Sequence, residues 1–176
     1  MKKTSLFLSL MLIPVLSVMI GCGGGGGGGG DVAATPSTKA IVTLSTTGTL
    51  SSGTKIGGIQ VTVNLPAGVT VQASPYSSGS STMVPDSGVI TASGSAAGSY
   101  TSGVYLAGTA ASTHKITMGL VNANGFSTGE FAQVSCDITT GSSPAAADFS
   151  LSNFTAVDLN GTPLTGLTTG FTVAFQ

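Results

Sequence analysis

From about Thr38 to the C-terminus, hydrophobic and polar residues alternate along a series of short segments. A period of two sends successive side chains to opposite faces of a β-strand, so that one face is buried and the other is wet. The clearest case runs from Lys115 to Ile138, where two alternating runs flank a turn-rich stretch, 122–129. We predict a strand, a turn and a strand there, forming a hairpin whose apolar face the other segments must cover.

The same pattern predicts further strands, separated by segments rich in Gly, Pro, Ser or Asn. They cover residues 40–44, 59–65, 69–73, 89–91, 100–106, 149–156 and 171–175. Residues 74–87 are expected to form a loop, and a slip of phase near Asn153 predicts a β-bulge or a change of sheet. No amphipathic helix of useful length follows residue 22. The pattern therefore predicts an all-β fold, a two-sheet β-sandwich of eight or nine strands.

The first 21 residues have the pattern of a secretory signal. A basic start is followed by an apolar run, 6–20, that is too short and too often interrupted for a comfortable membrane span. The run ends in Met19-Ile20-Gly21-Cys22, which resembles the lipobox of bacterial lipoproteins. This resemblance implies that Cys22 is lipidated and becomes the mature N-terminus. An ordinary cleaved signal followed by a chance cysteine is the alternative.

Residues 22–37 are predicted to be a flexible tether. Eight consecutive glycines, 23–30, offer no side chain to pack, and a coil of this length reaches on the order of 20 Å. Several acyl chains anchor a protein stably, so we expect attachment to a membrane through the N-terminal lipid. Among lipoproteins an aspartate after the cysteine is a signal for inner-membrane retention, and here Gly23 stands there. We therefore expect the cell envelope, at the outer membrane or cell surface, with a β-sandwich over residues 38–176.

The mature chain is almost uncharged. Its three lysines and six acidic residues leave a net charge of −3, and it has no arginine. That balance argues against nucleic acid as a partner, because phosphate binding needs many basic side chains. With 41% hydrophobic residues in the whole sequence, the chain is also too apolar for a solvated disordered protein.

Few residues offer catalytic or metal-binding chemistry. Cys136 lies in phase with apolar neighbours, so we interpret it as a buried core thiol. His114, the only histidine, begins a predicted strand near the surface, and no Gly-x-Ser-x-Gly elbow accompanies it. Asp158 and Asn160 are spaced like the front of a calcium loop, but a plain turn explains them without further ligands. We therefore predict no catalytic residue, no metal site and no cofactor; a structural calcium ion has no support.

Three segments carry a resemblance to a known family. They are GGIQVTVNLPAGVTV at 57–71, NGFSTGE followed by FAQVSCDI at 124–138, and DFSL with AVDLNGTPL at 148–164. Their spacing and turn residues are similar to those of cohesin modules over roughly residues 40–176. The resemblance implies a nine-stranded jelly-roll β-sandwich, related to several carbohydrate-binding modules. It also implies a non-enzymatic module that docks a protein partner, a dockerin or another, through one sheet face.

A carbohydrate-binding module for polysaccharide at the cell surface is the alternative function. Exposed aromatic rings stack on sugar rings, and the chain has no tryptophan, so the candidate ligand-binding residues are Tyr76, Tyr100 and Tyr105. Tyr105 is the best candidate, because we expect Val104 and Leu106 to face the core and Tyr105 to face the opposite way.

Overall fold

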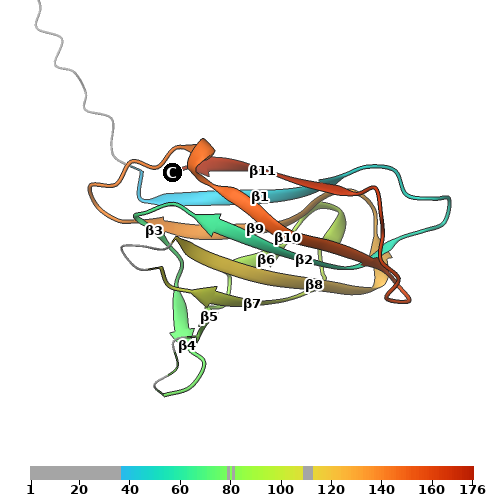
Figure 1. Ribbon diagram of the computed structural model, residues 1–176, viewed down its shortest axis with the longest axis horizontal. Coiled ribbons are helices and arrows are strands. Elements are labelled where there is room, and N and C mark those ends of the chain that lie inside the picture. Colours follow the sequence, from blue (N-terminus) through green and yellow to red (C-terminus); the bar gives the residue numbers. More distant parts are fainter. Residues whose placement is uncertain (1–36, 79, 81, 109–112) are drawn as a thin grey trace, which may run out of the picture. The chain divides into compact units, whose positions relative to one another are not determined.

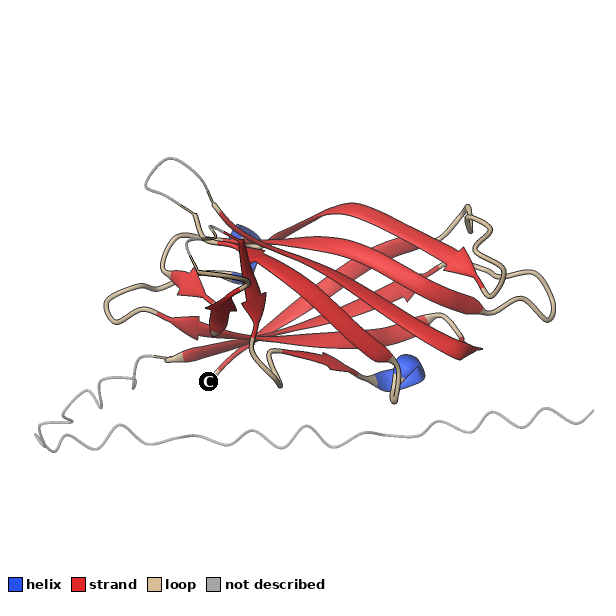
Figure 2. Cartoon of the chain, turned by 90° about the horizontal axis from the view of Figure 1, so that it is seen from below, coloured by secondary structure: helices blue, strands red, loops and turns tan. Residues whose placement is uncertain are grey.

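The structure is a computed structural model that describes residues 37–78, 80, 82–108 and 113–176. The predicted signal peptide, the lipidation site Cys22 and the tether up to residue 36 lie outside the described residues and stay predictions. The described chain forms eleven strands and two short 3₁₀ helices (Figures 1 and 2). The strands are β1 (Lys39–Thr47), β2 (Ile56–Leu65), β3 (Val69–Thr70), β4 (Ala73–Pro75), β5 (Thr82–Pro85), β6 (Ile90–Ala92), β7 (Tyr100–Leu106), β8 (His114–Phe126), β9 (Gly129–Ile138), β10 (Ser150–Asp158) and β11 (Thr168–Phe175). The 3₁₀ helices are η1 (Gly94–Ala96) and η2 (Ala146–Asp148).

The strands form two antiparallel sheets. One has the order β11–β1–β9, with β3 and β6 both pairing with β9, and the other has the order β10–β2–β8–β7–β5–β4. The two sheets stack face to face, as the view in Figure 2 makes plain. The predicted all-β, two-sheet sandwich is therefore confirmed, with eleven strands in place of eight or nine.

The core lies between the sheets and is built from the alternating residues. On β1 they are Ala40, Val42 and Leu44, and on β2 they are Ile59, Val61, Val63 and Leu65, all buried. Ile116, Met118 and Leu120 of β8 and Ala132, Val134, Cys136 and Ile138 of β9 are buried as well. Removing these apolar side chains from water is the main force that holds the two sheets together.

The predicted hairpin over residues 115–138 is wrong. β8 pairs with β2 and β7, whereas β9 pairs with β1, β3 and β6, so the chain crosses from one sheet to the other after Phe126. Residues 122–126, expected to form part of a turn, extend β8 instead. In a sandwich both strands bury one face whether they pair or oppose each other, and alternation therefore cannot separate the two arrangements.

The segment 74–87 does not form the single loop that the sequence predicts. It contains the hairpin of β4 and β5, which pair at Ala73–Pro85, Ser74–Val84 and Pro75–Met83 and project from the sandwich (Figure 1). The bulge predicted near Asn153 is confirmed. Asn153 has φ +53°, and the register of β10 on β2 shifts between Ser152 and Thr155.

Candidate functional site

The outward residues of β10, β2, β8 and β7 lie in register and form one surface, which we call the outer face. Four rows cross the strands: Val157–Gly58–Val121–Tyr100, Thr155–Gln60–Gly119–Ser102, Ser152–Thr62–Thr117–Val104 and Ser150–Asn64–Lys115–Leu106. Only Lys115, in the last row, carries a charge. The outer face is thus a nearly neutral surface that combines hydroxyl and amide groups with apolar side chains.

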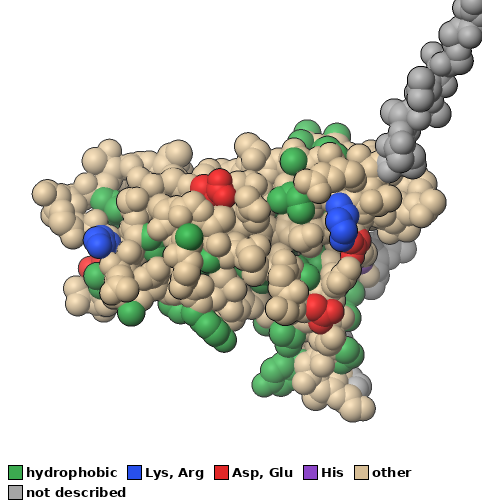
Figure 3. Space-filling view, turned by 180° about the vertical axis from the view of Figure 1, so that it is seen from behind, with side chains coloured by type: hydrophobic (Ala, Val, Ile, Leu, Met, Phe, Trp, Pro, Cys, Tyr) green, Lys and Arg blue, Asp and Glu red, His purple; other side chains and the backbone are tan. Residues whose placement is uncertain are grey.

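Large hydrophobic side chains exposed to solvent gather on and beside this face. The described residues include eight: Tyr76, Val84, Tyr100, Val104, Leu106, Val121, Leu159 and Phe175. Tyr100, Val104, Leu106 and Val121 lie on the outer face, while Tyr76 and Val84 lie on or next to the β4–β5 hairpin. Figure 3 shows hydrophobic side chains over the projecting hairpin and only scattered charged groups. Phe175 pairs in register with buried Ala40, so the outward side of the other sheet holds none of the eight.

Two glycines hollow the outer face. A side chain at Gly119 would meet only the Ser102 hydroxyl, 3.5 Å away, and Gly58 lies between the side chains of Val157 and Val121. The result is a hollow of about 330 Å³ that also borders Tyr100, Gln60 and Thr155. Its volume is at the lower end of the range of small-ligand pockets. It provides an apolar recess edged by polar groups.

A second hollow, which we call the hairpin groove, lies between the β4–β5 hairpin and β7. It has a volume of about 480 Å³, and its walls include Tyr76, Tyr100, Val104, Asp86 and Ser102. Tyr76 is 75% exposed and Tyr100 is 71% exposed, so neither ring is covered by the described chain. The structure therefore brings two of the three candidate tyrosines to one cavity, although 24 positions separate them in the sequence.

The prediction that Tyr105 is exposed is wrong. Its side chain is only 3% exposed and pairs with buried Ile116, whereas Val104 and Leu106 point outward. The Tyr105 hydroxyl lies 2.5 Å from His114 Nδ1, which also accepts a hydrogen bond of 3.1 Å from the Gly108 N–H. Burial raises the pKa of Tyr105 above its ordinary value. Tyr105 therefore helps to position His114 and offers no ring face to a surface ligand.

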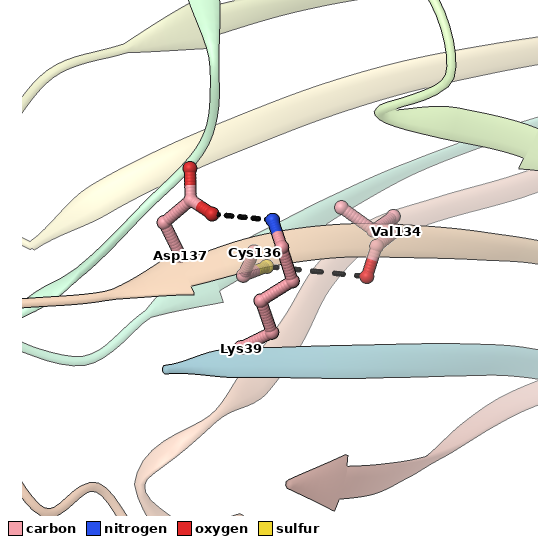
Figure 4. A network of polar contacts seen from close by, with 4 residues as sticks. All are labelled: Lys39, Val134, Cys136 and Asp137. Carbon is pink, nitrogen blue, oxygen red and sulfur yellow. Dashed lines mark hydrogen bonds and ion pairs between the residues drawn. The ribbon is translucent and has the colours of Figure 1, made fainter. Parts of the chain in front are cut away.

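Cys136 is the core thiol that the alternation predicts. It is 1% exposed, and burial, aided by the neighbouring Asp137 carboxylate, raises its pKa to about 12. Its Sγ lies 4.0 Å from the Val134 carbonyl oxygen, while Lys39 and Asp137 form an ion pair of 2.7 Å nearby (Figure 4). A thiol held protonated in this way is a poor nucleophile and a poor metal ligand.

Asp158 forms a turn, as the sequence predicts. Its Oδ1 accepts hydrogen bonds of 2.8 Å from the N–H groups of both Asn160 and Thr162, and these bonds, above all the one from Thr162, lower the pKa of Asp158. Within the ranges that the structure describes, no group of three or more His, Cys, Asp or Glu side chains is placed to hold a metal ion. Among the same residues no helix has the length and apolar character of a membrane span.

The outer face was not identified from the sequence. The alternation assigns Val104 and Leu106 to the core, and it gives Val121, next to the turn-rich stretch 122–129, no face. The strand β7 does show an alternation, but both of its faces mix apolar and polar residues. One face holds Tyr100, Ser102, Val104 and Leu106, and the other holds Thr101, Gly103 and Tyr105. The sequence of this strand alone does not say which set faces inward.

Comparisons with known proteins find little similarity. No protein-family model matches the chain, and no curated protein matches it. Among solved structures, the chain is similar to a non-cellulosomal cohesin from the hyperthermophilic archaeon Archaeoglobus fulgidus, with 16% sequence identity and a TM-score of 0.45. The similarity covers 74% of this chain and 75% of that one. It is distant, and the sandwich described above stands on the pairing of this chain's own strands.

Proposed function

We propose that this protein is a membrane-anchored, non-catalytic interaction module that docks a protein partner at the cell envelope through the outer face. The proposal depends on one observation, the gathering of Tyr100, Val104, Leu106 and Val121 on one nearly neutral sheet face. Soluble proteins rarely leave apolar side chains together in this way, and such patches mark interaction sites. A partner that covers these side chains removes them from water, which favours binding.

The polar groups of the outer face are held in fixed positions, which suits docking. The hydroxyls of Thr62 and Thr117 are hydrogen-bonded to each other at 2.9 Å across β2 and β8. The Asn64 side-chain amide donates to the hydroxyls of Ser150 and Ser152. A surface ordered before binding loses little conformational entropy on association. An ordered sheet face with an apolar recess fits a partner helix laid across it.

The sequence supplies the rest of the proposal. The lipobox-like Met19-Ile20-Gly21-Cys22 supports lipidation of Cys22, and the glycine tether would let the sandwich reach a partner away from the membrane surface. The resemblance of residues 40–176 to cohesin modules supports a dockerin-like partner. We propose the outer membrane or cell surface as the compartment, because Gly23, and not an aspartate, follows Cys22.

A pair of aspartate substitutions tests the docking face. Val121→Asp puts a charge on the outer face beside Tyr100, whereas Thr172→Asp puts the same charge on the outward side of the other sheet, where Thr172 pairs with Thr43. The lipidated chain in detergent is used to capture proteins from envelope extract, and the affinity of the captured partner is then measured for each variant. We expect Val121→Asp to bind at least ~10-fold more weakly and Thr172→Asp to bind like the unchanged chain. Equal affinities for all three would disprove docking through the outer face.

A further inference from the structure

The hairpin groove differs from the rest of the surface in holding two uncovered aromatic rings. Tyr76 is on the β4–β5 hairpin and Tyr100 begins β7, and both border the same cavity of about 480 Å³. A tyrosyl ring that is more than two-thirds exposed contributes little to the stability of the fold. Two such rings at one cavity present flat apolar faces to solvent, with hydroxyls that hydrogen-bond at their edges.

The groove exists because β5 leaves β7 early. The two strands pair only at Thr82–Leu106 and Met83–Tyr105. Pro85 lies two residues beyond Met83, and since proline has no N–H it cannot continue the ladder. On β7, Gly103 has no side chain; a Cβ there would lie 2.5 Å from Ile90 Cδ1 and 3.5 Å from Pro85 Cγ. The edge of β7 from Tyr100 to Val104 therefore borders a cavity lined at depth by apolar atoms.

Polar groups lie beside these apolar surfaces. The Asp86 carboxylate accepts a hydrogen bond of 2.8 Å from the Ser74 hydroxyl, which fixes its position at the groove. A carboxylate has about four acceptor sites, so one such bond leaves capacity for hydroxyl groups of a ligand. Ser87 and Ser102 add hydroxyls that both donate and accept. None of the residues that line the groove in the described chain is a lysine, arginine or histidine.

We propose that the hairpin groove binds a neutral polysaccharide chain. A pyranose ring with equatorial hydroxyls has two apolar C–H faces and a rim of hydroxyls, and this is the complement of two tyrosyl faces with an acidic and hydroxylic border. The carboxylate and the lack of cationic lining residues disfavour uronic acid or sulfated chains, which would be repelled by Asp86. This site is additional to protein docking through the outer face, although Tyr100, Ser102 and Val104 of β7 border both.

The test is affinity electrophoresis of the full chain in mild detergent, through gels containing one polysaccharide each. The probes are hydroxyethylcellulose, a β-1,3-glucan, xylan and galactomannan as neutral chains, with polygalacturonate as the anionic chain. We expect at least one neutral polysaccharide to retard the protein. Tyr76→Ala should weaken that retardation at least ~10-fold, Asp86→Asn ~3-fold or more, and Tyr76→Phe should keep most of it, because the ring face is retained.

Controls separate this site from the docking face and from misfolding. Tyr76 is exposed on the hairpin, so Tyr76→Ala should leave the thermal midpoint of unfolding unchanged, and Val121→Asp should leave the retardation unchanged. Retardation by none of the neutral chains, retardation by polygalacturonate alone, or unaltered retardation of Tyr76→Ala would each overturn the proposal. A Tyr76→Ala variant that loses partner capture, with no polysaccharide bound by the unchanged chain, would assign the groove to the protein interface instead.

Discussion

Asn153 is the only non-glycine residue of the described chain with a positive φ, +53°. It lies at the bulge of β10, where a left-handed residue lets the strand regain its pairing with β2. Asparagine tolerates this region, whereas a β-branched residue does not. We expect Asn153→Val to lower the free energy of unfolding by about 1–2 kcal/mol and Asn153→Gly to change it by less than about 0.5 kcal/mol. Urea unfolding followed by circular dichroism measures both; equal losses would contradict the strain at this residue.

Because Cys136 is buried, we expect the free energy of unfolding to fall at alkaline pH. Its pKa rises from an ordinary value of 9.0 to about 12 on folding, so the folded chain holds the proton more tightly than the unfolded chain does. The stability that this provides is complete below pH 9 and is lost as the pH rises toward 12, because the unfolded thiol ionises first. At pH 10 the expected loss relative to pH 7 is about 1 kcal/mol.

The measurement compares urea midpoints at pH 7 and pH 10. The reference chain carries Cys22→Ala, so that Cys136 is its only thiol, and the test chain carries Cys136→Ala as well. Replacing the buried thiol lowers stability at both pH values, but the further loss between pH 7 and pH 10 should be smaller by about 1 kcal/mol in the test chain. Identical pH dependence in the two chains would show that the thiol does not titrate as burial requires.

Cys136 and Tyr105 show what alternation can and cannot predict at the residue scale. Alternation correctly predicts that Cys136 lies in the core, because every other residue in its set is apolar. It wrongly predicts that Tyr105 lies on the surface, because both sets on β7 mix apolar and polar residues. The neighbouring strand decides the matter: Tyr105 lies opposite buried Ile116, and its hydroxyl reaches His114. That pairing depends on tertiary structure, which the sequence of one strand does not contain.

At the scale of elements, Gly57 on β2 has no room for a side chain, whereas Gly119 on the neighbouring strand β8 has room for one. A Cβ at Gly57 would lie 2.5 Å from the carbonyl oxygen of Asp158 and 2.8 Å from its carbonyl carbon, both backbone atoms that cannot rotate away. At Gly119 the nearest atom would be the Ser102 hydroxyl at 3.5 Å, which is ordinary contact. β2 therefore needs glycine at its start to approach the end of β10, whereas β8 does not need one at its centre.

We expect Gly57→Ala to destabilise the sandwich by about 1–3 kcal/mol through overpacking. Gly119→Ala should instead be neutral or stabilising by up to about 1 kcal/mol, because alanine loses less backbone entropy than glycine in a strand. Thermal unfolding of the two variants beside the unchanged chain gives the comparison. A larger loss from Gly119→Ala than from Gly57→Ala would contradict the packing described here.

The pairing of elements was predicted less well than their existence. The predicted strands at 40–44, 59–65, 100–106 and 171–175 all exist, since each combines alternation with flanking turn residues. The hairpin of β4 and β5 was missed, because Ser, Pro and Gly around those short strands are typical of loops. The sequence predicts one hairpin for β8 and β9, but Ser127 and Thr128 connect strands that lie in different sheets.

At the scale of the whole molecule, both candidate sites arise from topology. Tyr76 and Tyr100 meet at one groove because β5 joins the edge of β7 for only two residue pairs. The outer face exists because β10 and β2 bring Val157 and Gly58 beside Val121. The sequence names the two exposed tyrosines as candidates, but the outer face needs neighbours about a hundred residues apart, such as Gly58 and Val157.

The same topology leaves the outer face almost without charge, and this predicts how a docked partner responds to salt. Ionic strength screens charge pairs at an interface but leaves apolar contact unchanged or strengthens it. With Lys115 the only charge on the outer face, the affinity of a partner docked there should change less than ~3-fold between 50 and 500 mM NaCl. Surface plasmon resonance on the lipidated chain captured in vesicles would measure this. A fall of more than ~10-fold would mean that the partner contacts charged groups elsewhere, such as Lys39 and Asp137 on the opposite sheet, and the docking surface would have to be moved there.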